Sequence, residues 1–225
     1  ENEENKAYIV REYDDMDKPT AYRDYPNPKA EPVTLFLNDG GNSSGSLSTK
    51  QNRKMSRESL VDDVSFSGKD LAKAEKSDHR LLYLTAVLKD NLHISGIPKV
   101  SITLASSKPA ANLSVWLVAL PWEEGKAVRI TDNIITRGWA DPKNYKSLTD
   151  EEALVPGQYY TVDFELQADD QIIKAGQQIG LMVFSSDKEY TLHPKPGTVL
   201  TLDLNKTSIT IPVVGGKEAY NKVTD

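Results

Sequence analysis

The sequence predicts an all-β protein, a jelly-roll-like antiparallel β-sandwich with long loops and little helix. Short apolar or alternating segments recur along the chain, and Gly, Pro and Asn residues separate them, which is typical of sandwiches and barrels. Regular strand–helix alternation is missing, and this argues against a parallel α/β sheet. Loops that are longer at one end than at the other favour a jelly roll over a tight barrel, and no fixed repeat indicates a propeller.

The composition excludes several classes of protein. The chain has 225 residues, with 27 Lys or Arg, 33 Asp or Glu and no Cys. This length supports a core without disulfides or metal, and the missing Cys excludes a disulfide scaffold, a zinc ribbon and a thiol nucleophile. The net charge of -6 argues against nucleic-acid or anionic-membrane partners, and no apolar segment is long enough to span a bilayer. A cytoplasmic setting is the default expectation, and the initial Glu suggests a processed chain or an excised piece of a longer one.

The first third of the chain predicts few regular elements. Residues 1–30 are rich in Pro and Asp and are expected to form an extended arm or linker, with one short strand at 8–10. A compact strand is predicted at 33–37. Residues 42–59 have few apolar side chains and are predicted to form a long surface loop. A short helix is expected at 70–76.

The remainder of the chain predicts the body of the sandwich. We assign the sandwich domain to residues 31–214 and a frayed polar tail to residues 215–225. One helical turn is expected at 149–153, where Thr precedes acidic residues. The strands predicted from apolar runs or alternation are 80–88, 92–95, 100–104, 113–120, 127–131, 133–137, 160–166, 179–184, 199–204 and 208–213.

One short motif is typical of serine hydrolases. Ser43 lies in Gly-Asn-Ser-Ser-Gly at 41–45, which matches G-x-S-x-G, and a predicted strand precedes it. A nucleophile elbow requires the Ser at a strained turn that leads directly into a buried helix. The following residues, 46–55, are polar and have no apolar face, so we interpret the motif as part of a flexible loop.

The titratable residues give no further catalytic pattern. His79, His93 and His193 have neither metal-ligand spacing nor an evident Ser partner, and each is interpreted as a surface or structural residue. No calcium-loop or nucleotide-binding motif occurs. The sequence therefore predicts no catalytic residue, no cofactor-binding residue, no cofactor and no metal ligand. Adjacent carboxylates, which we expect in solvated turns, are Asp62–Asp63, Glu123–Glu124, Glu151–Glu152 and Asp169–Asp170.

The three tryptophans leave two interpretations open. Trp116 lies in the most apolar predicted strand and is expected in the core. Trp122 and Trp139 lie beside turns, where they fit either a core or domain interface or a carbohydrate platform. An independent carbohydrate-binding module is therefore a competing hypothesis, and it requires both side chains on one concave face.

An ordered set of segments resembles the C-terminal domain of Xaa-Pro dipeptidyl-peptidases, the serine peptidase family that also includes cocaine esterase-like hydrolases. The resemblance covers roughly residues 80–214, and its closing run is closer to the lactic-acid-bacterial peptidases than to the esterase branch. Gly176-Gln177 departs from the Gly-His common in the family. The segments that carry the resemblance are RLLYLT (80–85), LHISGIPKV (92–100), LSVWL (113–117), ITRG (135–138), VPG (155–157), the strand at 160–166, AGQQIGL (175–181), FSSD (184–187) and HPKPGT (193–198) through TSITIP (207–212).

The resemblance implies a function for a longer parent protein. The family's enzymes release Xaa-Pro dipeptides from peptide N-termini, and their Ser, Asp and His lie in an α/β-hydrolase domain upstream of the matched region. No triad residue therefore has a counterpart here, and we expect this chain to be non-catalytic. The partners implied are its own catalytic domain, the parent's peptide substrates and a second copy in a homodimer. Residues 1–30 and 38–59 are the predicted contacts; an esterase or acylase parent is the alternative within this fold.

Overall fold

The structure is a computed structural model that describes residues 7–9, 20–22, 24–51, 54–124 and 133–225. The elements of the first half are β1 (Ala7–Ile9), β2 (Thr20–Tyr22), β3 (Ala30–Asn38), β4 (Gly45–Ser48), β5 (Arg57–Val61), α1 (Gly68–Lys73), β6 (Arg80–Leu84), β7 (Leu92–Gly96) and β8 (Lys99–Ser106). Those of the second half are β9 (Leu113–Leu120), β10 (Ile134–Ala140), the 3-10 helix η2 (Pro142–Asn144), β11 (Tyr159–Glu165), β12 (Asp169–Ile173), β13 (Gln178–Phe184), β14 (Val199–Asp203), η3 (Leu204–Lys206), β15 (Ser208–Val214) and α2 (Gly216–Thr224).

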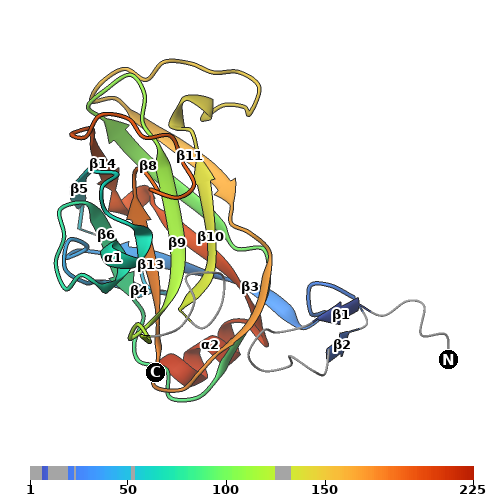
Figure 1. The fold of residues 1–225 in the computed structure, drawn as a ribbon. Helices are drawn as coiled ribbons and strands as arrows, with labels where there is room; N and C mark the ends of the chain where they lie inside the picture. Colours follow the sequence, from blue (N-terminus) through green and yellow to red (C-terminus); the bar gives the residue numbers. More distant parts are fainter. Residues whose placement is uncertain (1–6, 10–19, 23, 52–53, 125–132) are drawn as a thin grey trace.

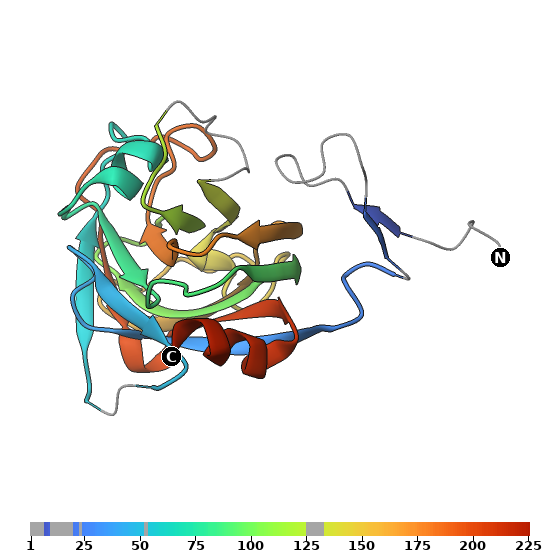
Figure 2. The ribbon, with the colours of Figure 1, turned by 90° about the horizontal axis from the view of Figure 1, so that it is seen from below.

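The strands form two layers that face each other across a core (Figures 1 and 2). One path of paired strands runs β10-β9-β13-β6-β4-β3-β15-β8-β14-β5, and β11, β12 and β7 pair beside it. The pairs along this path are antiparallel except for β4 with β6, which are parallel. This arrangement confirms the predicted all-β sandwich.

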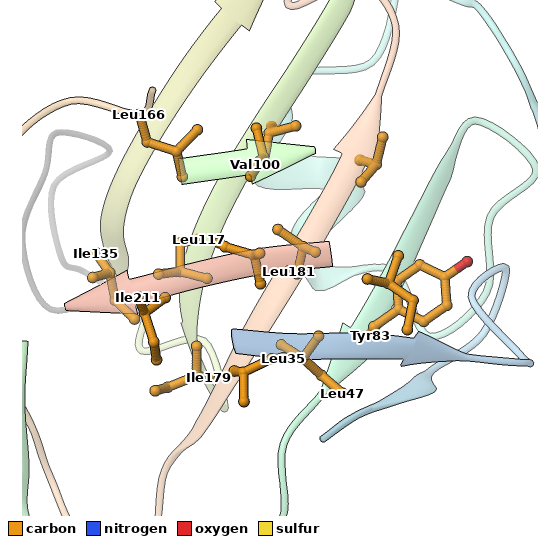
Figure 3. Packing of buried hydrophobic residues seen from close by; sticks show 14 of the residues in the cluster. Leu35, Leu47, Tyr83, Val100, Leu117, Ile135, Leu166, Ile179, Leu181 and Ile211 are labelled. Carbon is orange, nitrogen blue, oxygen red and sulfur yellow. The ribbon is translucent and has the colours of Figure 1, made fainter. Parts of the chain in front are cut away.

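Alternation along the strands places the core between the layers. In β15, Ile209, Ile211 and Val213 are fully buried while the residues between them are partly exposed. Side chains from both layers meet in one cluster, in which Leu117 and Leu181 lie near Leu35 (Figure 3). Burial of this apolar surface is the main stabilising contribution to the fold.

The layer made by β10, β9, β13 and β6 is covered on its outer face as well. Strand β9 is buried on both sides, which explains its continuous apolar run. On the outer side α1 packs so closely that a Cβ at Gly68 would lie 2.2 Å from the Trp116 ring. We call the residues of this side the outer cluster: Leu71, Ala72, Leu82, Trp116, Val118, Ile134, Met182 and Phe184. The core position predicted for Trp116 is confirmed.

Residues 42–59 are not the surface loop that the sequence predicted. They include β4 and the start of β5, and Leu47 is buried in the core. Gly41 and Gly45 allow the chain to pass close to Tyr83, since a Cβ at either would come within 2.6 Å of that ring or its hydroxyl. The prediction was wrong because β4 is short and polar and has no apolar pattern of its own. Its strand conformation depends on pairing with β3 and β6.

The C-terminal residues are also more ordered than predicted. Instead of a frayed tail, residues 216–224 form α2, which lies against β3 and β15. Tyr220 and Val223, three positions apart, point to one side of the helix and are 3% and 5% exposed. Burial raises the pKa of Tyr220 to about 12. The sequence signal was weak because only one helical face is apolar and the helix is short.

Several smaller predictions also differ from the structure. The predicted helix at 70–76 is α1, which begins two residues earlier behind a capping box made by Ser67 and Asp70. The predicted turn at 149–153 is not helical; η2 forms before it, capped by Asp141. Strand β12 occupies what was expected to be a solvated turn. The predicted strand at 127–131 lies outside the described residues, as does most of the arm apart from β1 and β2.

Candidate functional site

Ser43 is not placed as a nucleophile elbow. It lies in a turn closed by its N–H to the carbonyl of Gly40, and β4 follows the turn instead of a helix. Its hydroxyl donates to the carbonyl of Glu75 at 3.4 Å. The glycines of the motif are accounted for by the close passage over Tyr83, which supports interpreting the motif as a loop.

The three histidines have separate structural partners. His79 contacts the carbonyl of Val61 through Nδ1 at 2.8 Å, and His193 contacts the carbonyl of Lys188 through Nε2 at 2.7 Å. His93 Nε2 lies 3.0 Å from Asp170 Oδ1. This pair joins β7 to β12, the two strands that carry the residues, and is a contact within the sheet. In the part of the chain that is described, no group of His, Asp and Glu is arranged to hold a metal.

The adjacent carboxylates fall into two kinds. Glu124, Glu151 and Glu152 form exposed ion pairs with lysines, as expected for solvated turns. Asp62 and Asp170 are instead buried, at 2% and 9% exposure. Asp62 accepts hydrogen bonds from the N–H and hydroxyl of Ser186, so it holds a loop and is no acid–base pair with its neighbour Asp63.

Trp122 and Trp139 do not form a common platform. Trp122 lines a groove of about 460 Å³ beside α1, together with Leu84 and Leu120. Trp139 lies elsewhere on β10, where its ring stacks on Tyr190 at 4.9 Å and its indole N–H donates to Asp187. The two side chains therefore lack the shared concave face that the carbohydrate-binding hypothesis requires.

A buried polar centre surrounds Asp187, which is fully buried in the loop three residues after β13. Its Oδ2 accepts the indole N–H of Trp116 at 2.9 Å and that of Trp139 at 3.1 Å. Its backbone carbonyl accepts the N–H groups of Tyr190 and Thr191. One carboxylate thus joins β9, β10 and the loop that follows β13, and it gives that loop a rigid base.

Residues 185–198, which we call the β13–β14 loop, combine this rigid base with an exposed tip. At the base, Ser185 bonds the carbonyl of Asn112 and Ser186 bonds Asp62. At the tip, Tyr190 is 48% exposed and Leu192 is 83% exposed. Large apolar side chains held out on a fixed base are typical of a protein-interaction site.

Arg137 lies under this tip and is only 7% exposed. Its Nη2 donates to the hydroxyl of Tyr190 at 2.7 Å, while Nε and Nη1 are buried without a hydrogen-bond partner among the described residues. The guanidinium lies 4.2 Å from the Tyr190 ring centre and within 5.7 Å of those of Trp116 and Trp139. Aromatic faces therefore compensate part of its charge, but two of its nitrogens have no acceptor.

No motif or spacing in the sequence pointed to Arg137, Asp187, Tyr190 or Leu192 as site residues. Arg137 and Asp187 stood within segments that carried the family resemblance, but neither position was given a role. The grouping could not be inferred, because it joins three strands and a loop from separate parts of the chain. The signal that was present is the pair of polar interruptions, Arg137 and Asp187, within or directly after apolar strands.

Comparisons with known proteins agree with the resemblance. Residues 3–224 match the sequence model of a family described as the X-Pro dipeptidyl-peptidase C-terminal non-catalytic domain. A protein of Rhodopirellula baltica named "Putative Xaa-Pro dipeptidyl-peptidase" is 54% identical over 212 residues, which cover 94% of this chain and 34% of that protein. The Xaa-Pro dipeptidyl-peptidase of Lacticaseibacillus rhamnosus is 27% identical and is covered for 28% of its length.

A solved structure shares the fold. The aminopeptidase from a marine sediment archaeon of the Thaumarchaeota superposes with a TM-score of 0.69 over 92% of this chain and 40% of that chain, at 14% identity. The chain spans about a third of the length of the curated relatives given above. It belongs to the family of X-Pro dipeptidyl-peptidase C-terminal non-catalytic domains.

Proposed function

We propose that this chain is the C-terminal part of an enzyme that releases Xaa-Pro dipeptides from peptide N-termini by serine hydrolase chemistry. The observation that supports this most is the family match over residues 3–224, together with a 54% identical relative named for that activity. The reactive Ser, His and Asp belong to the preceding α/β-hydrolase domain. This chain packs on that domain, excludes water from the contact and limits which peptides reach the active site.

The proposal includes the limits of the domain and its setting. The sandwich is residues 31–214, residues 1–30 are the connection to the hydrolase, and the location is cytoplasmic. The contact proposed for residues 38–59 is narrowed to the exposed part near Met55, which is 76% exposed, because β4 and Leu47 belong to the core. A homodimer is a further element of the proposal. Among the helices of the described residues, none has the length and hydropathy of a membrane span.

The activity is tested on the full-length protein that contains this chain. We expect release of p-nitroaniline from an Xaa-Pro p-nitroanilide and much slower release from the matched Xaa-Gly substrate. The same protein with Ser43→Ala should keep its kcat/KM, since Ser43 Oγ has only a loop carbonyl as partner. The isolated chain of 225 residues should release nothing.

Two outcomes contradict the proposal. Equal rates on the Pro and Gly substrates would exclude a dipeptidyl-peptidase specific for Pro. Turnover by the isolated chain that disappears in Ser43→Ala would place the catalytic serine here. Analytical ultracentrifugation of the full-length protein checks the dimer, and cell fractionation checks the location, independently of either result.

A further inference from the structure

We infer that Arg137 receives a carboxylate from the hydrolase part of the full-length protein, and that the tip of the β13–β14 loop is the surface that docks there. The inference rests on the proposed function, because it assigns a partner to a domain that this function places beside a hydrolase. It identifies the partner by chemistry: one Asp or Glu side chain with an apolar surround.

The first reason is the incomplete bonding of a buried cation. Arg137 is nine-tenths buried, yet Nε and Nη1 have no acceptor among the described residues. A buried polar group without a partner is costly, and buried charges are normally paired. Arg80, which is also buried, donates instead to three backbone carbonyls. An incompletely bonded Arg137 therefore indicates that its acceptor is supplied from outside the chain.

The second reason is the geometry of the surroundings. The rings of Trp116, Trp139 and Tyr190 lie around the guanidinium, between 4.2 and 5.7 Å from it. Its remaining interactions are hydrogen bonds from its nitrogens, for which a carboxylate is the strongest partner in proteins.

The third reason is the composition of the exposed rim. The hydroxyl of Tyr190 accepts a hydrogen bond from Arg137 Nη2, and the Tyr190 side chain is half exposed. Tyr190 therefore connects the buried guanidinium to the protein surface. Leu192 lies beside it at 83% exposure. Tyr and Arg surrounded by apolar contacts are the commonest anchors of protein interfaces. On docking, the Tyr190 ring turns outward onto the partner. One carboxylate oxygen then binds Nε, which has no acceptor among the described residues, and the other takes the place of the Tyr190 hydroxyl at Nη2.

The test uses the full-length protein with the photo-reactive residue p-benzoylphenylalanine in place of Leu192. We expect cross-links within one molecule, to a hydrolase peptide that contains Asp or Glu. Hydrogen exchange then measures the docking: the amides of residues 188–193 should lose protection by about 30-fold in Arg137→Met, the loss typical when one partner of a buried charge pair is removed. Lys195→Met, which removes an exposed charge from the same loop, is the matched control and should change protection less than about threefold.

Each other result has a defined meaning. Cross-links to a second copy, or to no protein, overturn the inference, as does Arg137→Met with unchanged protection. If Arg137→Met fails to fold, the cross-link in otherwise native protein still decides. Arg137→Lys keeps the positive charge but removes the planar guanidinium. An equal loss of amide protection in Arg137→Lys and Arg137→Met therefore supports the inference, because it shows that the guanidinium geometry is needed. If the full-length protein turns over the Xaa-Pro substrate but Arg137→Met leaves the amide protection unchanged, only the docking is refuted. If the expected cross-link forms but the substrate is not turned over, only the proposed activity is refuted.

Discussion

Two buried arginines in the same layer, on strands that β9 and β13 separate, differ in how completely they are hydrogen-bonded. Arg80, at the start of β6, donates from Nε to Leu71, from Nη1 to Gly41 and from Nη2 to Ala74, each time to a backbone carbonyl. Arg137, in β10, donates from Nη2 to Tyr190, and its Nε and Nη1 have no acceptor within the described part of the chain. Burial lowers the pKa of Arg80 to about 10, so it stays charged at neutral pH. Arg80, whose guanidinium nitrogens all donate hydrogen bonds within the chain, stabilises the fold. Arg137, which is hydrogen-bonded only in part, indicates a contact with a partner outside this domain.

The largest effect is expected for Arg80→Met. The substitution removes three hydrogen bonds to buried or partly buried carbonyls, two of them at the end of α1, and each lost bond costs on the order of 1 kcal/mol. The carbonyl of Gly41 keeps the N–H of Leu82 as a donor. We expect the free energy of unfolding of the chain to fall by about 3 kcal/mol. Urea denaturation followed by circular dichroism measures it. Lys99→Met, at an exposed ion pair, is the control and should leave the midpoint nearly unchanged.

An intermediate effect is expected for Asp187→Asn. The amide keeps one acceptor oxygen, but its NH₂ group must then face either the two indole N–H groups or the N–H of Glu189. The loss should be about 1.5 kcal/mol, with a change in tryptophan fluorescence because Trp116 and Trp139 lose or share their acceptor. Asp163→Asn, at an exposed position of β11, provides the comparison. An unaltered emission spectrum would show that Asp187 does not hold the two indoles.

The smallest effect is expected for Arg137→Met in the isolated chain. A thioether of similar length keeps the contacts with the aromatic rings and removes a cation that has one hydrogen bond. The free energy of unfolding should change by less than about 1 kcal/mol in either direction. The same urea titration as for Arg80→Met gives the value. A loss as large as that of Arg80→Met would mean that Arg137 is fully compensated within the domain, and the contrast between the two arginines would disappear.

The sequence was most informative where local pattern and burial coincide. Strands β8, β9, β11, β13, β14 and β15 were predicted within a few residues, because each carries a continuous apolar run or a clear alternation. β4 and β12 were missed, since both are short and polar and are held by pairing with distant strands. The helix α2 was missed for a similar reason: its stability comes from Tyr220 and Val223 packing on the sheet.

The candidate site was much less predictable than the fold. Trp139 was noted as an aromatic beside a turn, but its acceptor, Asp187, is 48 positions away. The G-x-S-x-G pattern around Ser43 was correctly set aside because no helix follows, although the reason for its glycines became clear only with Tyr83 beside them. A motif records neighbours along the chain, and these contacts are between residues far apart along it.

The amino-acid sequence by itself determined the fold class, because hydrophobic alternation and turn residues act over a few positions. It also determined the family, because an ordered set of such segments can be recognised as similar to those of other members. Only the tertiary structure decided which polar groups are satisfied. Hydrogen-bond partners of a buried charge come from whichever strands pack beside it, so the full bonding of Arg80 and the open nitrogens of Arg137 depend on three-dimensional neighbours.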